Sequence, residues 1–223
     1  MPYLLRGALI EYGSDFLGPI PNVVIFQFNP ESLTRNMEIP RRPTGAGSRE
    51  TSQAGEAPVE RITLTAHFSA ADQLNRDDPL ARAFGIGPQL AALEKMVHPA
   101  GKISGLIGEA LDAIGSAISG GGDTSPTQPI PRENYPRILF IWGLTRVLPV
   151  VIDSMSITEQ HFDPLLNPIQ AEVSLGLSVI NIDPCSDDRI AKGAMEYSNL
   201  AKDAQAIANL ANTAQQVVDI IPF

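Results

Sequence analysis

The chain is poor in the residues that build disulfide scaffolds and metal centres. It has one cysteine, Cys185, and three histidines, His67, His98 and His161. A single thiol cannot form an internal disulfide, and no two histidines have the spacing of metal ligands. The acidic stretches around Cys185 differ from the electropositive surroundings that activate a catalytic thiol. We therefore expect structural or surface roles for all four residues, with no metal and no cofactor.

Positive charge is also scarce. The 223 residues include 16 lysines and arginines against 25 aspartates and glutamates, a formal net charge of -9. The only adjacent basic pair is Arg41-Arg42, which lies in a polar, proline-containing stretch. A nucleic-acid-binding protein would present a basic face to phosphate, so this composition disfavours DNA and RNA as partners.

Long apolar runs are absent as well. No stretch approaches the roughly eighteen consecutive apolar residues that a membrane-spanning helix needs. The first residues do not have a charged leader followed by an apolar run and a small-residue cleavage site. We expect no membrane insertion, and synthesis and folding in the cytoplasm.

Catalytic motifs are not visible either. The glycine-rich stretches 84–88 and 120–123 lack the following Gly-Lys-Ser/Thr of a phosphate-binding loop, and no Gly-x-Ser-x-Gly elbow occurs. The carboxylate pairs Asp77-Asp78 and Asp187-Asp188 are adjacent in sequence, so they cannot face each other across a substrate. Both pairs suit the starts of helices. The sequence predicts that the protein is not an enzyme.

The residues that are present favour β-structure over most of the chain. Residues 59–68 alternate between apolar and polar side chains, as a half-buried strand does. Further strands are expected, on alternation or dense β-branched and aromatic runs, at 3–12, 23–28, 31–39, 137–143, 147–152, 154–162 and 170–182. Asn29-Pro30 should end the second of these, since proline has no amide hydrogen to donate.

Helical periodicity appears in three places. A helix should start at Asp77-Asp78-Pro79, and residues 89–98 form its firmer continuation. Residues 101–118 have a one-sided apolar pattern, which fits a helix packed on the core or a contact with a neighbour. The alanine-rich stretch 187–221 predicts one long helix or a helical pair, docked on its own domain or on a partner.

These patterns predict an α+β fold that is mainly β. The expected domains are a β domain at 1–184, with a helical and flexible insertion at about 99–131, and a helical extension at 185–223. Residues 40–58 are rich in proline and glycine and predict a long exposed loop. Such a loop in a compact domain usually has a function.

Several segments together resemble a known family. Residues 26–33 (Phe-Gln-Phe-Asn-Pro-Glu-Ser-Leu) are similar to the opening motif of the tube-related proteins of contractile injection systems, phage-tail-like particles such as antifeeding prophages. Matching segments follow in the family's order over residues 3–182: Glu60–Leu64, Phe68 with Asp72, Phe140–Gly143, 152–162 and 168–173. Many relatives end in a small LysM domain, whereas this chain ends in its alanine-rich stretch.

The resemblance implies a tube-protein-like β-barrel or two-sheet core that assembles into a six-fold ring. It implies an adaptor that joins the inner tube to the baseplate and spike, in a particle assembled in the cytoplasm and released. The motif residues expected in the core are Phe26, Phe28, Asn29, Pro30, Trp142 and Gly143. The residues expected at the assembly interface are Arg41, Arg42, Arg49, Glu60 and Arg61.

Alternatives remain open. Within the same particle, the chain could be an inner-tube repeat or a cap-end adaptor. A different class is a β-module that binds a small ligand or carbohydrate, with Trp142 as a stacking platform. A hydrolase is the least favoured alternative, and it would depend on His67, His161 or Cys185.

Overall fold

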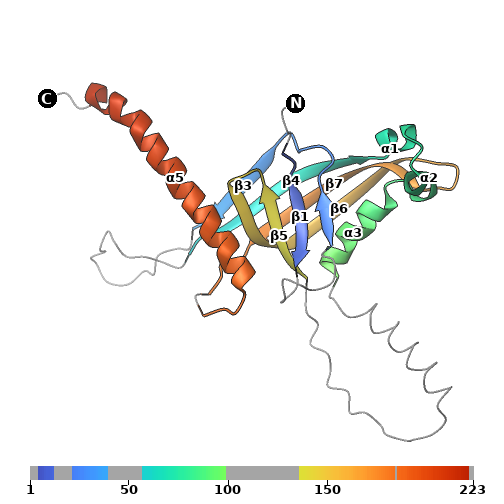
Figure 1. Cartoon of the computed structure of the whole chain (residues 1–223), viewed down its shortest axis with the longest axis horizontal. Coiled ribbons are helices and arrows are strands. Elements are labelled where there is room, and N and C mark those ends of the chain that lie inside the picture. The colour runs from blue at the N-terminus through green and yellow to red at the C-terminus, as the bar shows by residue number, and fades with distance from the viewer. Residues whose placement is uncertain (1–4, 13–21, 40–56, 99–135, 184, 221–223) are drawn as a thin grey trace, which may run out of the picture.

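Seven antiparallel strands form one sheet in the computed structural model, which describes residues 5–12, 22–39, 57–98, 136–183 and 185–220 (Figure 1). The predicted insertion at 99–131 and nearly all of the predicted loop 40–58 lie outside these residues. The sheet order is β2-β1-β5-β6-β7-β4-β3. The strands are β1 (Ala8–Tyr12), β2 (Val23–Ile25), β3 (Leu33–Glu38), β4 (Val59–Ser69), β5 (Arg137–Trp142), β6 (Arg146–Phe162) and β7 (Pro168–Val179).

The α+β fold class is thus confirmed, and the described strands belong to one sheet rather than two. The outer strands are β2 and β3, and among the described residues neither pairs with the other. As far as the described residues show, the sheet of a single chain is therefore open at both edges.

One predicted strand boundary is wrong. The stretches 147–152 and 154–162 form one continuous strand, β6. Ile152 faces Leu177 and Ser154 faces Gly176, so Asp153 is an extra residue in a β-bulge. The bulge shifts the apolar alternation by one residue, so that Met155 and Ile157 pack on the same core as Val150. In sequence, this change of phase looks like a break between two strands.

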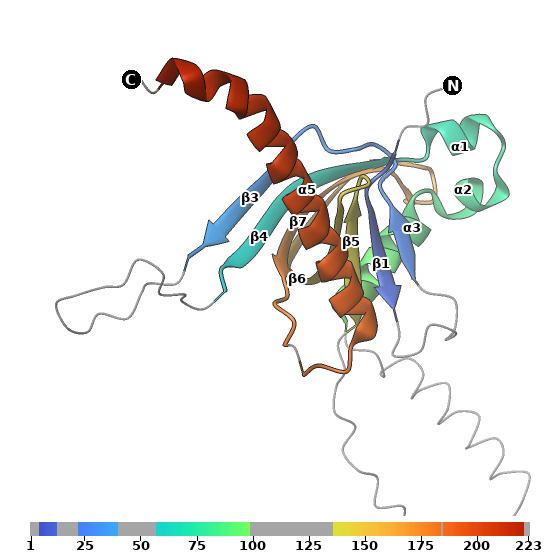
Figure 2. The same cartoon turned by 60° about the vertical axis from the view of Figure 1, so that its left-hand side comes forward.

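The strand expected at 23–28 also differs. It is β2, and it ends at Ile25. The chain then leaves the sheet and crosses toward the opposite edge, where β3 begins at Leu33. A flat sheet of seven strands would separate its outer strands by about 29 Å, which is the full reach of that linker. The sheet is curved instead, and Figure 2 shows this curvature.

The core lies between one face of the sheet and a short helical segment. Alternate residues of β4 and β7 are buried on this face, among them Ile62, Leu64, Val173 and Leu175. Helices α1 (Ala71–Asn75), α2 (Pro79–Phe84) and α3 (Gly87–Val97) follow β4. From α3, Leu90, Leu93 and Met96 join the same apolar cluster. Asp78 caps α2 by accepting a hydrogen bond from the Leu80 amide, as the predicted helix start requires.

The C-terminal helix α5 (Arg189–Ile220) packs on the other face of the sheet. Leu9 and Phe140 point to the core, so their strand neighbours Tyr12 and Arg137 point the opposite way. The side chains of Tyr12 and Arg137 both contact Asp188, 3.0 and 3.4 Å away, where α5 begins. Figure 2 shows α5 in front of the sheet and α3 behind it.

The prediction of a long C-terminal helix is confirmed, and it is one helix rather than a pair. The Oδ1 atom of Asp188 accepts a hydrogen bond from the Ala191 amide at 2.9 Å, so the predicted acidic helix start is present. Ala191, Ala194 and Ser198 are buried against the domain. Beyond Lys202 the helix leaves the sheet (Figure 1).

Candidate functional site

The two motif segments meet at one glycine, which the sequence did not single out. The Gly7 amide donates to Asn29 Oδ1 at 3.1 Å, and the Gly7 carbonyl accepts from the Phe26 amide at 2.9 Å. The Asn29 side chain also donates to the Leu5 carbonyl at 2.8 Å. We call Gly7, Phe26, Asn29 and Trp142 the Gly7 junction.

Close approach explains why glycine occupies this position. A Cβ atom at Gly7 would lie 2.7 Å from the Phe26 ring and 2.8 Å from the Trp142 ring. Phe26 is fully buried, and Trp142 stacks on Phe140 with ring centroids 5.8 Å apart. The Phe26 ring has no room to withdraw without opening the core. The junction therefore joins two segments that lie about a hundred residues apart in the sequence.

The motif residues expected in the core divide into two groups. Phe26 and Pro30 are buried, and Trp142 packs against the core while remaining partly exposed. Asn29 is exposed but holds the Gly7 junction. Phe28 was expected in the core and is 50% exposed, because the chain has left β2 and only the Phe26 ring faces inward. Gly143 begins the β5–β6 turn at φ 66°, a backbone conformation that favours glycine.

The motif also covers part of a sheet edge. Beyond Leu64, β4 extends past the start of β3 and has no strand neighbour on that side. There Gln27 accepts a hydrogen bond from the Ser69 amide at 2.8 Å. The motif is therefore a structural connection between the two edges of the sheet.

Glu60, one of the residues expected at the assembly interface, is buried within its own chain, and its role in assembly stays a prediction. It is 8% exposed and lies 2.5 Å from Arg35 on β3 and 3.7 Å from Lys202 on α5. Burial disfavours its charge, but Arg35 and then Lys202 outweigh burial and hold the pKa of Glu60 below its usual value. This carboxylate connects an edge strand to the C-terminal helix.

Arg61 points to the opposite face and is exposed. It forms a surface ion pair with Glu38 of β3. Its role in assembly stays a prediction. Arg41, Arg42 and Arg49 lie outside the described residues, so the structure says nothing about them.

The outer strand β3 is the larger open edge. Its six residues pair with β4 on one side and with no described strand on the other. Met37 is 53% exposed, and Ile39, directly after the strand, is 80% exposed. The edge therefore combines unpaired backbone groups with apolar side chains in water, a combination that favours pairing with another chain.

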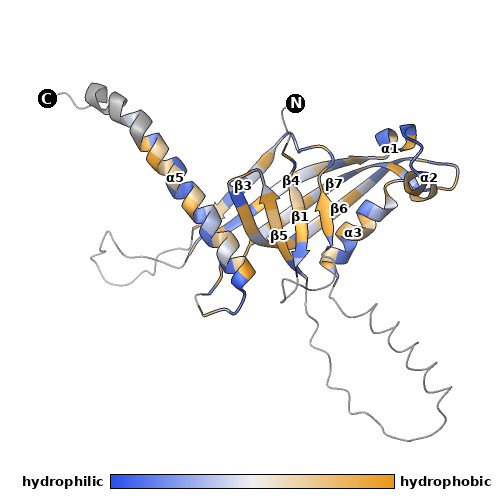
Figure 3. Cartoon of the chain, viewed as in Figure 1, coloured by the Kyte–Doolittle hydropathy of each residue, from blue (hydrophilic) through white to orange (hydrophobic). Residues whose placement is uncertain are grey.

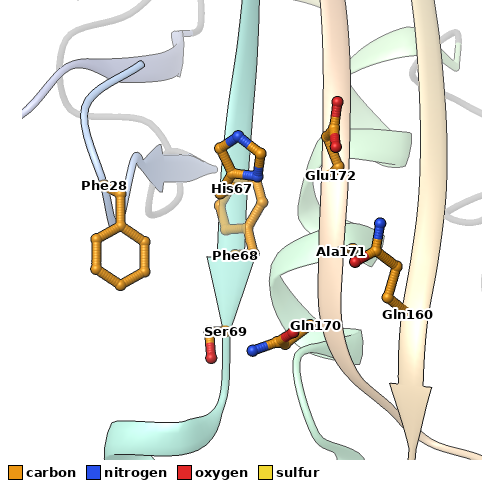
Figure 4. Close-up of a pocket in the computed structure, with 8 residues that line it drawn as sticks. All are labelled: Phe28, His67, Phe68, Ser69, Gln160, Gln170, Ala171 and Glu172. Carbon is orange, nitrogen blue, oxygen red and sulfur yellow. The ribbon is translucent and has the colours of Figure 1, made fainter. Parts of the chain in front are cut away.

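A small hollow lies on the polar face of the sheet, with a volume of about 230 Å³ (Figure 4). His67 and Glu172 are direct cross-strand neighbours there, and Gln160 and Gln170 are another such pair. Phe28 lies at the side of the hollow (Figure 4). The lining offers hydrogen-bonding groups and one aromatic ring, but no paired carboxylates or activated nucleophile.

The remaining histidines and the cysteine lie apart. His98 is exposed at the end of α3, where its Nδ1 atom is 2.7 Å from the Glu94 carbonyl. His161 and Cys185 are exposed. Within the described part of the chain, no three histidine, cysteine, aspartate or glutamate side chains are grouped to hold a metal ion. No described helix is both long and apolar enough to cross a membrane.

Comparison with known proteins adds no relative. No protein-family model matches the chain, and no curated protein sequence matches it.

Proposed function

We propose that this protein is a structural, ring-forming subunit of a contractile injection particle. In this proposal it is the adaptor between the inner tube and the baseplate or spike. The observation that carries the proposal is the open edge of the sheet at β3. The role of the protein would be mechanical. It would present a template for the first tube ring and transmit sheath contraction to the spike.

Edge pairing between copies would convert an open sheet into a closed one. Exposed edges invite strand addition, and a closed barrel removes them. In a ring, the β3 edge of one copy would meet the β2 edge of the next. That contact is heterologous, and it closes when the rotation between copies divides a full turn. The six-fold number and the tube-like barrel come from the motif resemblance.

The appendages favour an adaptor over an inner-tube repeat. Stacked tube rings leave little space around each subunit, whereas α5 projects from the domain (Figure 1). The sequence also predicts an insertion at about 99–131. The partners in this proposal are copies of the same chain, the inner tube protein, and the baseplate and spike proteins. The subunit would assemble in the cytoplasm and leave within the particle.

The substitution Ile39→Asp tests the edge. Ile39 is 80% exposed in the monomer, so a charge there should leave the fold intact. If β3 pairs with a neighbouring copy, the introduced charge would be buried in the contact. Because burial of an unpaired charge is costly, ring assembly should fall sharply. The control is Leu165→Asp, the same kind of change at a residue 76% exposed in the β6–β7 turn. Equal assembly of the two variants, counted by electron microscopy, would contradict the proposal.

The hollow beside Phe28 supports a second candidate, a small-ligand or carbohydrate-binding module. The amide groups of Gln160 and Gln170 and the Phe28 ring suit a polar ligand with one apolar face. The earlier expectation that Trp142 is the platform loses support, because its ring packs on Phe140 and Gly7. A glycan array with Gln170→Ala as the control variant would test this candidate. Binding that depends on Gln170 would favour it over the ring subunit.

A further inference from the structure

The described side chains in the outer part of α5 are largely exposed to water. Every described residue from Asp203 to Leu210 is exposed, although the helix continues to Ile220. We call α5 beyond Lys202 the arm. In proteins, most of the stability of a helix comes from packing of an apolar face rather than from intrinsic propensity. A second contact surface would account for an arm that remains helical.

Apolar residues on the arm, together with Leu200 just before it, follow a heptad spacing. Leu200, Ala204 and Ile207 are separated by four and then three residues, and all three are exposed. In the sequence, Ala211, Ala214 and Val218 continue the same alternation of four and three. Figure 3 shows apolar residues along α5 where it projects from the sheet. A heptad repeat is the pattern with which one helix packs along another, so the partner it favours is a helix.

The residues that dock α5 on its own sheet are not the residues of the heptad pattern. The two sets form two separate stripes on the helix. The docked stripe consists of Ala191, Ala194 and Ser198, which are buried. The heptad stripe starts at Leu200 and lies on another side of the helix, where Leu200 and Ile207 are each 69% exposed. The domain's own packing therefore leaves Leu200, Ala204 and Ile207, the described members of the heptad stripe, exposed.

The charge of the arm indicates what kind of partner helix could pack against it. From Ala204 to Val218 the sequence has no charged residue, and no lysine or arginine occurs after Lys202. An anionic membrane surface or an acidic protein would need basic residues here. Two copies of this chain, each with a net charge of -9, repel one another over most of their surface. The uncharged stretch from Ala204 to Val218 is a surface on which they can approach without that repulsion.

We propose that the arm of α5 pairs with the arm of a second copy of this chain through the heptad stripe. The contact is separate from the β3 edge and goes beyond the ring proposal. Higher salt should strengthen the pairing, because it screens the repulsion between two acidic chains.

The test compares Ile207→Asp with Asn209→Asp. Both substitutions add one negative charge to the exposed arm, but only Ile207 lies on the stripe. Both are made in full-length chains that also contain Ile39→Asp, which removes the proposed edge contact. Sedimentation velocity with a reductant present then reports arm pairing alone, and far-ultraviolet circular dichroism reports helix content against concentration.

We expect the parent chain, which contains Ile39→Asp alone, to self-associate and to gain helix content as its concentration rises. Ile207→Asp should weaken association by about a hundredfold or more, since a charge would be buried between apolar residues. Asn209→Asp should change it by about twofold at most. Unchanged tryptophan emission from Trp142 confirms that the domain is intact. A parent that stays monomeric, or equal association of the two variants, overturns arm pairing and leaves the ring proposal standing.

Discussion

The Gly7 junction and the arm of α5 are opposite kinds of surface. At the junction, the Gly7 amide and carbonyl have partners within the chain, and two aromatic rings leave no room for a Cβ atom. On the arm, the apolar residues Ile207 and Leu210 face water and are 69% and 67% exposed. The junction stabilises the fold, and the arm is available for assembly.

This difference shows what the recognisable motif does. Phe26, Asn29 and Trp142 make their contacts within the domain, so these motif residues stabilise the fold rather than form a surface for a partner. The surfaces that the proposals use for assembly, the β3 edge and the arm, lie outside the Phe-Gln-Phe-Asn-Pro and Trp-Gly segments. Substitutions should separate the two: changes at the junction should reduce stability, and changes at the edge or arm should reduce assembly.

The largest expected effect is that of Gly7→Ala. The added methyl group would overlap the rings of Phe26 and Trp142, which a packed core cannot relieve. We expect the free energy of unfolding to fall by about 3 kcal/mol, measured by urea denaturation. The control is Gly193→Ala in α5, where a Cβ atom would meet nothing within 4 Å. That change should stabilise the helix by up to about 1 kcal/mol. A neutral Gly7→Ala would show that the junction does not hold the fold.

Glu60→Gln should have an intermediate effect. It removes the charge that connects β3 to α5 through Arg35 and Lys202. We expect a loss of about 2 kcal/mol at neutral pH, by urea denaturation. The matched control is Glu38→Gln, in an exposed ion pair with Arg61, which should cost at most about 0.5 kcal/mol.

The pH dependence of the Glu60 effect has a defined sign. The pKa of Glu60 is lowered from 4.5 in the folded state, so folding favours its charged form. The stabilisation is fully present above the unfolded-state pKa and is lost as pH falls through the folded-state pKa. The difference between wild type and Glu60→Gln should therefore shrink as the pH drops below 4.5. A difference that stays constant into strong acid would show that the ion pairs are not its source.

The smallest effect is expected for Ser198→Ala. The Ser198 hydroxyl accepts from the Val147 amide at 2.9 Å and donates to the Val147 carbonyl at 2.6 Å. Its removal leaves both backbone groups of Val147 without this partner, a cost of about 1 kcal/mol. Hydrogen exchange should show faster exchange of the Val147 amide. Asn199→Ala, at an exposed neighbour, should leave that rate unchanged; equal effects would contradict the role given to Ser198.

Much of the sheet could be predicted from the sequence because its strands alternate cleanly. In β4, apolar Ile62, Leu64, Ala66 and Phe68 occupy every second position, and all four are buried. The C-terminal helix and its acidic start were predictable for the same reason, since spacing and end chemistry are local properties.

The rest depends on contacts that no local pattern contains. The Asp153 bulge changes the phase of β6, so one strand looked like two. Glu60 looked like a surface residue beside Arg61, and only the arrival of Arg35 and Lys202 from β3 and α5 shows its buried role. Gly7 gave no signal at all, because its constraint comes from two rings that reach it from distant segments.

Electron microscopy of particles from the native host, isolated through a tag on this chain, tests the central proposal most directly. The ring-adaptor account predicts sheathed rods with the tag confined to one end, in an amount that matches a single ring. Tag along the whole rod would identify an inner-tube repeat instead. A monomer isolated without rods or companions would contradict the account and favour the ligand-binding module.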